Sequence, residues 1–132
     1  MNSLPGIIQT YIDAYNRMDV AAMLACLSDD VTFSNISGGE VTAETSGKQA
    51  FAELANLGVQ AFASRHQKVV NVISVVDTTL IEVDYSAVVS VDLPNGWKAG
   101  QNLQFRGGLA FRIAGGLVVS IVDQSGHSEK TG

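Results

Sequence analysis

Apolar residues recur at helical spacing in the first half of the chain and at every second position in the second half. The first pattern predicts a helix over about residues 4–18, with Pro5 in its first turn. The apolar stripe of this helix consists of Ile7, Ile8, Tyr11, Ile12 and Tyr15. Asp19 is typical of an N-cap residue and predicts a second, short helix directly after the first.

The sequence changes character after the second helix. Ser28-Asp29-Asp30 ends that helix in this interpretation, and two short strands follow at 31–35 and 41–45 on either side of the turn Gly38-Gly39. A third helix is predicted from about residue 48 to 63. Its inward side carries Phe51, Leu54, Ala55, Gly58 and Phe62.

From His66 onward the hydrophobic period is two. Strands are predicted at about 67–76, 79–91, 101–113 and 117–124. The separators are Asp77-Thr78, the Asn-Gly turn in Leu93-Pro94-Asn95-Gly96, and Ala114-Gly115-Gly116. Helices first and a sheet of consecutive antiparallel strands later indicate an α+β fold, with the helices on one face of the sheet.

Alternation assigns a face to each residue of the long strands. One face of the second long strand carries Ile81, Val83, Tyr85, Ala87, Val89 and Val91. One face of the third carries Leu103, Phe105, Gly107, Leu109, Phe111 and Ile113. One face of the fourth carries Leu117, Val119, Ile121, Asp123 and Ser125. Asp123 is therefore an acid in a row that is otherwise apolar or small. Gly107-Gly108 inside a strand predicts a sharp bend or a bulge.

Composition limits the function classes. The chain has 132 residues, of which 46% are hydrophobic and 16% charged, which fits one domain over 1–126 and a polar C-terminal tail over 127–132. A single cysteine, Cys26, excludes an internal disulfide, and we expect it to be a buried small hydrophobe. Two histidines and one cysteine do not make a closed zinc site. We expect no metal and no cofactor.

Charge and hydropathy exclude two kinds of partner. The net charge is −5 and the basic residues are scattered, which argues against nucleic acid. No apolar stretch reaches the roughly 20 residues of a membrane span. The first residues show no basic segment followed by an apolar block, as a secretion signal would. We expect a cytoplasmic protein without a membrane partner.

Four residues are candidates for chemistry. Burial of Asp123 would raise its pKa and suit it to general acid or base work, or Asp123 is a strand-end acid that reaches water. Tyr11 and Tyr15 share a helix face. They are either core aromatics or phenols that donate a hydrogen bond to a ligand oxygen. Asn35 shares a side with apolar neighbours, where it orients a water or a carbonyl, or it is a turn residue.

Other polar or aromatic residues carry less information. His66 is interpreted as a rim or surface residue, and His127 in the tail receives no role. Trp97 follows the Asn-Gly turn, either as an exposed aromatic at a partner surface or as a lid over a pocket. No nucleophile elbow, phosphate-binding loop or dinucleotide fingerprint occurs in the sequence.

Four segments together resemble the nuclear transport factor 2-like superfamily, which includes ketosteroid isomerases, polyketide-cyclase-like proteins and limonene epoxide hydrolases. They are 11–19 (YIDAYNRMD), 27–35 (LSDDVTFSN), 46–51 (SGKQAF) and 117–123 (LVVSIVD). Their order and spacing cover about residues 7–125. The resemblance implies a cone-shaped, curved, mostly antiparallel sheet that encloses an apolar pocket with three helices.

The resemblance also implies residue roles. Tyr11 falls where ketosteroid isomerases place the oxyanion-stabilising tyrosine, whereas Asn35 and Leu109 replace their catalytic base and second acid. Two missing groups argue against the isomerase reaction as that family runs it. Asp123 falls where epoxide hydrolases and polyketide-cyclase-like proteins place a catalytic acid. Asn35 resembles the water-holding asparagine of the epoxide hydrolases, but Phe33 replaces their tyrosine and 84–88 contains no arginine.

The polyketide-cyclase-like pattern therefore conflicts least with the sequence. Our leading hypothesis is proton transfer on an apolar, carbonyl-bearing ligand, with Asp123, Tyr11 and Asn35 as catalytic residues. The residues expected to contact the ligand are Tyr15, Phe33, Phe62, Tyr85, Phe105 and Leu109. The alternative is a non-catalytic ligand-binding or accessory domain of the same fold.

A further hypothesis is association. The resemblance implies a homodimer through the outer face of the sheet, on which acids and arginines would pair across a two-fold axis. That face carries Glu82, Asp84, Ser86, Val88, Ser90, Gln104, Arg106 and Arg112.

Overall fold

The computed structural model describes residues 4–126, so the expected tail 127–132 and His127 lie outside the described residues. Within these residues, three helices and six strands follow one another. The elements are α1 (Gly6–Asn16), α2 (Val20–Ala25), β1 (Leu27–Ser37), β2 (Glu40–Ser46), α3 (Lys48–Ala61), β3 (Phe62–Val75), β4 (Thr78–Val89), β5 (Asn102–Ala114) and β6 (Leu117–Ser125).

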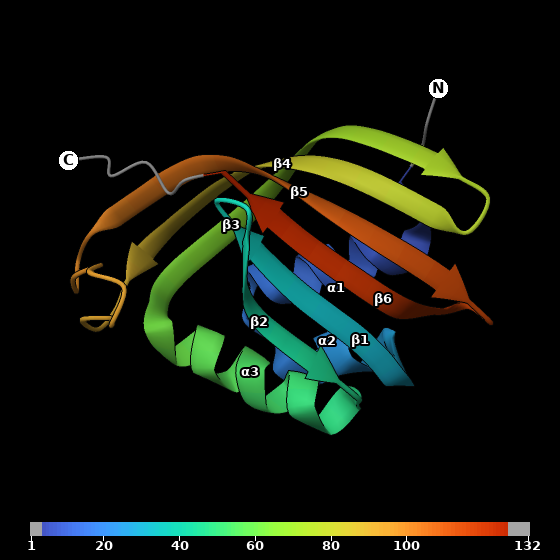
Figure 1. The fold of residues 1–132 in the computed structure, drawn as a ribbon, viewed down its shortest axis with the longest axis horizontal. Coiled ribbons are helices and arrows are strands. Elements are labelled where there is room, and N and C mark those ends of the chain that lie inside the picture. Colours follow the sequence, from blue (N-terminus) through green and yellow to red (C-terminus); the bar gives the residue numbers. More distant parts are fainter. Residues whose placement is uncertain (1–3, 127–132) are drawn as a thin grey trace.

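The strands form one sheet in the order β2-β1-β6-β5-β4-β3. All neighbours pair antiparallel except β1 and β6, which run parallel and connect the N-terminal strand pair to the C-terminal meander. Figure 1 shows a strongly curved sheet, with α1 and α2 behind β1 and β6 and with α3 along its lower edge. The predicted α+β class and the curved, mostly antiparallel sheet with three helices are confirmed.

The two N-terminal helices begin as their sequence predicts. Pro5 precedes α1, and its carbonyl accepts from the backbone N–H groups of Ile8 and Gln9 at 3.0 Å. The Asp19 carboxylate accepts from Ala22 N at 3.0 Å and caps α2. Both helices bury their apolar sides, so the helical period of the sequence places Tyr11 toward the sheet.

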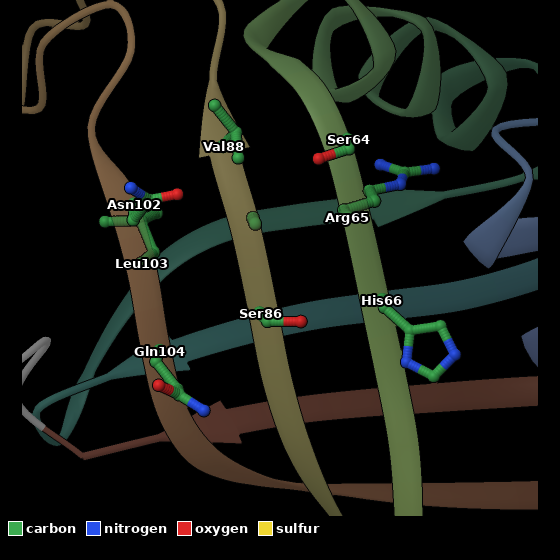
Figure 2. A pocket seen from close by; sticks show the side chains of 9 residues that line it. Ser64, Arg65, His66, Ser86, Val88, Asn102, Leu103 and Gln104 are labelled. Carbon is green, nitrogen blue, oxygen red and sulfur yellow. The ribbon is translucent and has the colours of Figure 1, made fainter.

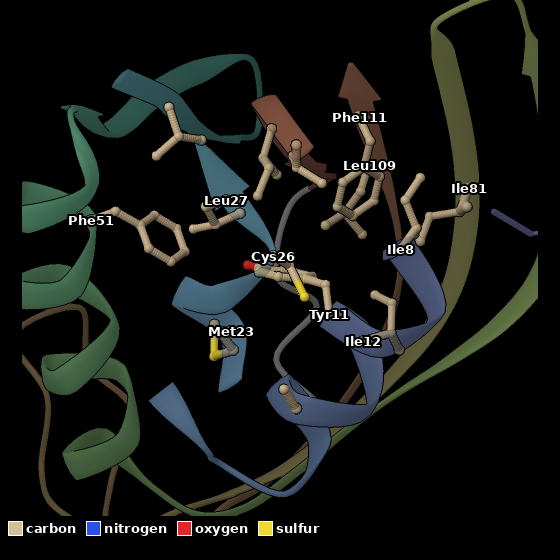
Figure 3. Packing of buried hydrophobic residues seen from close by; sticks show 14 of the residues in the cluster. Ile8, Tyr11, Ile12, Met23, Cys26, Leu27, Phe51, Ile81, Leu109 and Phe111 are labelled. Carbon is tan, nitrogen blue, oxygen red and sulfur yellow. The ribbon is translucent and has the colours of Figure 1, made fainter. Parts of the chain in front are cut away.

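Buried residues form a main cluster between the helices and the middle of the sheet (Figure 3). Ile8 and Tyr11 from α1 meet Leu109 and Phe111 from β5 there, and the Tyr11 and Phe111 rings are 5.8 Å apart in an edge-on arrangement. A smaller cluster consists of Tyr85, Ala87, Val89 and Leu103. Cys26 is a buried free cysteine, as expected.

Two predicted boundaries are wrong at the helix–strand junctions. Ser28-Asp29-Asp30 lies inside β1, which begins at Leu27 and not at residue 31. The register between β1 and β6 shifts between Leu27 and Thr32, and this irregularity interrupts the alternation that would have revealed the strand. The third helix ends at Ala61, and Phe62 is already extended (φ −124°, ψ 136°) and pairs with Val89 in the sheet.

Two turns differ from the prediction as well. The turn between β3 and β4 is Val76-Asp77, so Thr78 belongs to β4. The Leu93–Gly96 turn does form, and Gly96 N donates to Leu93 O at 3.1 Å. It lies, however, within a connection over 90–101, and Val91 is exposed there instead of extending the inward face of β4.

The prediction for the start of β6 is also wrong. Val118 is completely buried, whereas Leu117 is 37% exposed. A register shift between Arg112 and Ile113 places Val118 opposite Ile113 and Ser120 opposite Arg112, so Val119 has no partner and the alternation reverses there. Beyond this bulge the predicted face is correct: Ile121 is buried and Asp123 follows it on the same side.

Candidate functional site

Asp123 lies in a single row of residues across the sheet. It pairs with Asn35 of β1 on one side and with Leu109 of β5 on the other. The row continues from Asn35 to Ala43 and from Leu109 to Ile81. Side chains in one row of a sheet face the same way, so Asp123 and Asn35 form a polar pair among apolar neighbours on the face that carries the helices.

A cavity of about 270 Å³ lies in front of this row, on the side of α3. We call it the helix-side cavity. Its lining residues come from all three helices and from five strands. They are Tyr11, Tyr15, Met23, Phe33, Asn35, Ala43, Phe51, Leu54, Ala55, Gly58, Phe62, Arg65, Gln67, Leu109 and Asp123. Figure 3 shows Tyr11, Met23, Phe51 and Leu109 around this part of the interior.

A second cavity of about 440 Å³ adjoins the first and lies on the side of the β4–β5 connection. We call it the loop-side cavity. Five residues line both cavities, namely Tyr15, Asn35, Phe62, Gln67 and Asp123. Its other lining residues are Ser37, Thr42, Val83, Tyr85, Asn95, Trp97, Phe105, Gly107 and Ser125. Asp123 therefore lies where the two cavities meet.

Trp97 is half-buried over the loop-side cavity. Its ring centroid is 6.4 Å from that of Phe62, and its backbone N–H donates to the Asn95 side chain at 3.0 Å. Two further side chains hold the connection: Ala99 N donates to Asp92 Oδ1 at 2.9 Å, and Lys98 N donates to Gln101 Oε1 at 3.0 Å. The sequence left two interpretations of Trp97, and its position in the wall of a cavity agrees with the second, a residue that covers a pocket.

Burial governs the electrostatics of Asp123. It raises the pKa of the carboxyl group from its ordinary 3.8 to about 6, because water stabilises the charged form less well at this half-buried position. Among residues 4–126, no side chain donates a hydrogen bond to this carboxyl group and no cation pairs with it. A carboxyl group with a pKa near neutrality and no partner is suited to take up or deliver a proton.

Three tyrosines surround the space in front of Asp123. Burial raises the pKa of Tyr11 and of Tyr85, so both stay neutral phenols. The Tyr15 hydroxyl donates to the Tyr85 hydroxyl at 3.3 Å. The Tyr11 hydroxyl has no hydrogen-bond partner within residues 4–126, and the charge of Asp123 adds to the rise of its pKa. Tyr11 is thus a free neutral donor close to the carboxyl group.

Asn35 is oriented by its neighbour strand. Its Nδ2 donates to Thr42 Oγ1 at 2.7 Å, and Thr42 Oγ1 donates in turn to the Asn35 carbonyl at 3.3 Å. This pair of bonds fixes the amide and leaves its oxygen available as an acceptor. Asn35 is therefore a sheet residue beside Asp123 and not a turn residue.

The structure brings all nine predicted site residues to the two cavities. Tyr11, Phe33 and Leu109 line the helix-side cavity, and Tyr85 and Phe105 line the loop-side cavity. The other four are Tyr15, Asn35, Phe62 and Asp123, which line both. Their roles in chemistry stay predictions. His66 is exposed on the opposite face of the sheet, as expected for a surface residue.

A third hollow, of about 600 Å³, lies on that opposite face across β3, β4 and β5 (Figure 2). Ser64 and His66 line it from β3, Ser86 and Val88 from β4, and Asn102 and Gln104 from β5. It contains none of the predicted site residues, and the sheet separates it from Asp123. We therefore place the candidate site on the helix side.

Two polar residues of the cavities were missed by the sequence interpretation. Arg65 and Gln67 are buried and line the helix-side cavity from β3. The strand was predicted to begin only at residue 67, which left Arg65 outside it. Alternation counted back from Val69, which packs against the main cluster, would have placed Gln67 and Arg65 on the inner face. A register shift between Phe62 and Ser64 lets Phe62 face the same way.

Metal and membrane features were searched in the described part of the chain. Residues 4–126 contain no cluster of three or more His, Cys, Asp or Glu side chains that could hold a metal ion. No helix in the same range is long and apolar enough to cross a membrane.

The sequence of residues 8–121 matches the family described as the SnoaL-like domain. The match spans most of the chain, so the chain belongs to this family, which is part of the nuclear transport factor 2-like superfamily. The resemblance predicted from four short segments is confirmed. None of the curated proteins matches the chain by sequence.

Solved structures share the fold at low sequence identity. A putative polyketide cyclase from Xanthomonas campestris is 23% identical, with a TM-score of 0.71 over 90% of this chain and 87% of that one. A protein with a ketosteroid isomerase-like fold from Catenulispora acidiphila, solved with trimethylamine, is 15% identical, with a TM-score of 0.75 over 92% and 85%. An LEH-like epoxide hydrolase from M. tuberculosis is 18% identical, with a TM-score of 0.70 over 90% and 79%.

Proposed function

We propose that this SnoaL-like domain binds an apolar, carbonyl-bearing small molecule in the two adjoining cavities and catalyses proton transfer on it. The observation that carries the proposal is the state of Asp123. Its carboxyl group is unpaired, has a pKa of about 6 and lies where the two cavities meet. A structural acid in the same place would be expected to have a partner or to reach bulk water.

The reaction needs only groups that the chain supplies. The Asp123 carboxylate takes a proton from the carbon next to the ligand carbonyl, and the electron pair of the broken C–H bond forms an enolate. The Tyr11 hydroxyl donates a hydrogen bond to the enolate oxygen. Where the ligand carries a C=C bond between its β and γ carbons, the enolate extends over that bond, and Asp123 then returns its proton to the γ carbon, which completes an isomerisation. Alternatively, the enolate carbon attacks a second carbonyl and Asp123 protonates the new alkoxide, which completes a ring closure.

Position and charge support these roles. Tyr11 is neutral and free to donate, and it lies close enough to Asp123 for the acid to influence its pKa. Asn35 stands next to Asp123 in the parallel register, with its amide fixed by Thr42. The Asn35 oxygen is thus available to orient a ligand hydroxyl or a water beside the reacting carbon.

The test is exchange of the methyl protons of 2-acetonaphthone in D₂O, a bicyclic ketone without any other reactive group. The wild-type protein should accelerate exchange, and Asp123→Asn should lower that rate at least about 100-fold, as expected for loss of a general base. Glu53→Gln likewise replaces a carboxylate by an amide, at an exposed position of α3, and should leave the exchange rate unaltered. Circular dichroism confirms that each variant is folded.

The rate should also rise with pH through about 6, because only the ionised carboxylate accepts a proton. Full exchange activity in Asp123→Asn would contradict the proposal. A wild-type protein that binds the ketone without catalysing exchange would favour the alternative, a non-catalytic binding domain.

A further inference from the structure

Arg65 presents a positive charge to the helix-side cavity, separate from the acid that the proposed function uses. It lies two residues before Gln67 on β3, so the two side chains project from the same face of the strand. The residue is only 7% exposed, and it lines the cavity together with Tyr11 and Tyr15. Since a guanidinium group keeps its charge at all ordinary pH values, this wall is permanently cationic.

The protein neutralises this charge only in part. Arg65 Nε donates to the Tyr15 carbonyl at 3.1 Å, and Nη2 lies 4.0 Å from Met23 Sδ, a weak acceptor. The guanidinium carbon lies 3.7 Å above the centroid of the Tyr15 ring. None of the ion pairs within residues 4–126 includes Arg65. Buried cations in proteins are usually paired with an anion.

The charge reaches the space where a ligand would lie. Although burial has the larger effect and raises the pKa of Tyr11 and Tyr15, the Arg65 charge acts in the opposite direction on both phenols. Arg65 thus stabilises negative oxygen at this wall of the cavity. Arg65 lies on β3 and Asp123 on β6, with β4 and β5 between these strands in the sheet. The cation and the acid are therefore two separate polar ends of the site.

Neighbouring residues leave room for a ligand group at the guanidinium. Gly58 of α3 faces Nη1, and a Cβ atom at this position would lie only 3.3 Å from that nitrogen. Gln67 Oε1, in the same wall, is buried and lacks a hydrogen-bond partner within the described residues. Two polar groups of one strand thus line the cavity, a cation that the protein neutralises only in part and an acceptor without a partner within the described residues.

We propose that Arg65 binds an acidic oxygen of the ligand, a carboxylate or an equally anionic enolate or phenolate, at the end remote from Asp123. This inference rests on the proposed function in that the same cavity holds the ligand, and it specifies the substrate class as an apolar organic acid. Arg65 supplies charge and orientation, while Asp123 performs proton transfer. The Gln67 oxygen accepts a hydrogen bond from a neighbouring hydroxyl of the same ligand.

The test compares 2-naphthoate with 2-acetonaphthone, which replaces the carboxylate by a neutral acetyl group on the same ring system. Titration calorimetry at pH 7.5 should show at least about tenfold tighter binding of 2-naphthoate to the wild-type protein. Arg65→Met should abolish this preference. Arg106→Gln removes the same charge from an exposed arginine and should retain it. Equal affinity of the wild-type protein for the two probes would overturn the proposal.

A second measurement needs no variant, so its result does not depend on whether Arg65→Met folds. The ¹³C shift of labelled 2-naphthoate, followed over pH, gives the pKa of the bound carboxyl group. Contact with Arg65 should lower this pKa below that of free 2-naphthoate, whereas an apolar cavity without an anion site would raise it. A raised pKa overturns the proposal even if the affinities differ.

The two proposals fail in different ways. Asp123→Asn removes the proposed base and should still prefer 2-naphthoate, since an ionised Asp123 only repels an anion. If the wild-type protein prefers 2-naphthoate but does not catalyse proton exchange on the ketone, only the proposed function is contradicted. Proton exchange that depends on Asp123, without any naphthoate preference, contradicts the role of Arg65 alone.

Discussion

The proposed function requires an ionised Asp123, and the same charge makes the folded protein less stable. An ionised carboxylate in this position accepts fewer hydrogen bonds than it would in water. Ionisation of Asp123 therefore lowers the free energy of unfolding. Its pKa is about 6 in the folded protein against an ordinary 3.8. This difference corresponds to about 3 kcal/mol of unfolding free energy.

The sign of this effect predicts how stability depends on pH. Below pH 3.8 the carboxyl group is protonated in both states and does not destabilise the fold. Between 3.8 and about 6 the folded state binds more protons than the unfolded state, so this contribution to stability is lost as pH rises. Asp123→Asn should therefore raise the unfolding free energy by up to about 3 kcal/mol at pH 7.5 and by almost nothing at pH 3.5.

Urea unfolding of the wild-type protein and the variant at these two pH values measures the difference. Glu53→Gln, on an exposed surface of α3, should show no comparable gain at either pH. An Asp123→Asn variant that is equally stable or less stable than the wild type at pH 7.5 would show that the carboxylate is solvated in the folded protein.

Alternation could locate Asp123 and Tyr11 from sequence because each belongs to a long periodic segment. Asp123 follows buried Ile121 on β6, and Tyr11 lies within an apolar stripe of α1. Arg65 could not be found in this way. It stands at the helix-to-strand transition, and its burial depends on Tyr15 and Met23, which are distant in sequence. Periodicity is a local signal and contains no information about such contacts.

At the scale of elements, irregular strands explain most of the differences between prediction and structure. The register shifts in β1 near Thr32 and between β5 and β6 near Ile113 each reverse the alternation. Regular segments such as α1, β4 and β5 were predicted to within two residues at each end, because their patterns keep one period over most of their length. Bulges depend on pairing with a neighbour strand and leave little trace in the sequence.

At Gly107 of β5, the neighbouring strand lies too close for a residue with a side chain. A Cβ atom there would lie 3.3 Å from the backbone oxygen of Gln124, which the β5–β6 pairing holds in place. Gly107→Ala should therefore lower the unfolding free energy by about 1–3 kcal/mol, since β6 cannot move away without breaking the pairing next to Asp123.

Gly108 provides a matched control for this change. A Cβ atom at Gly108 would lie 3.5 Å from the Ile81 oxygen, which is an ordinary van der Waals contact. Gly108→Ala should leave stability unchanged or increase it, because alanine loses less backbone freedom on folding. Thermal unfolding of both variants measures the difference, and equal effects of the two would contradict the steric argument.

At the scale of the whole molecule, the outer face of the sheet combines a charged cluster with an apolar area. Arg106 forms ion pairs with Glu82 and Asp84 of its own chain, and Asn71 donates to Glu82 at 2.6 Å. The sequence hypothesis expected such acids and arginines to pair between two copies. These charges already pair within one chain. The apolar area beside them is the part of this face that an interface could bury without leaving a charge unpaired.

That area lies beside the cluster, where Leu80, Ala110 and Val122 surround a hollow of about 360 Å³. Leu80, the third residue of β4, is exposed although it pairs with Ala110 inside the sheet. We propose that two copies of the chain associate through this area, with the two-fold axis passing near Leu80. An apolar area bordered by neutralised charges is well suited to such an interface, because its burial leaves no charge without a partner.

Leu80→Asp should therefore convert a dimer into a monomer, because two buried carboxylates would face each other across the axis. Sedimentation velocity over a range of protein concentrations measures the state of association. Leu57→Asp, the same change at an exposed leucine of α3 on the helix side of the sheet, should leave the dimer intact. A wild-type protein that sediments as a monomer at the highest concentration would refute the dimer. Loss of association in Leu57→Asp alone would instead move the interface to α3.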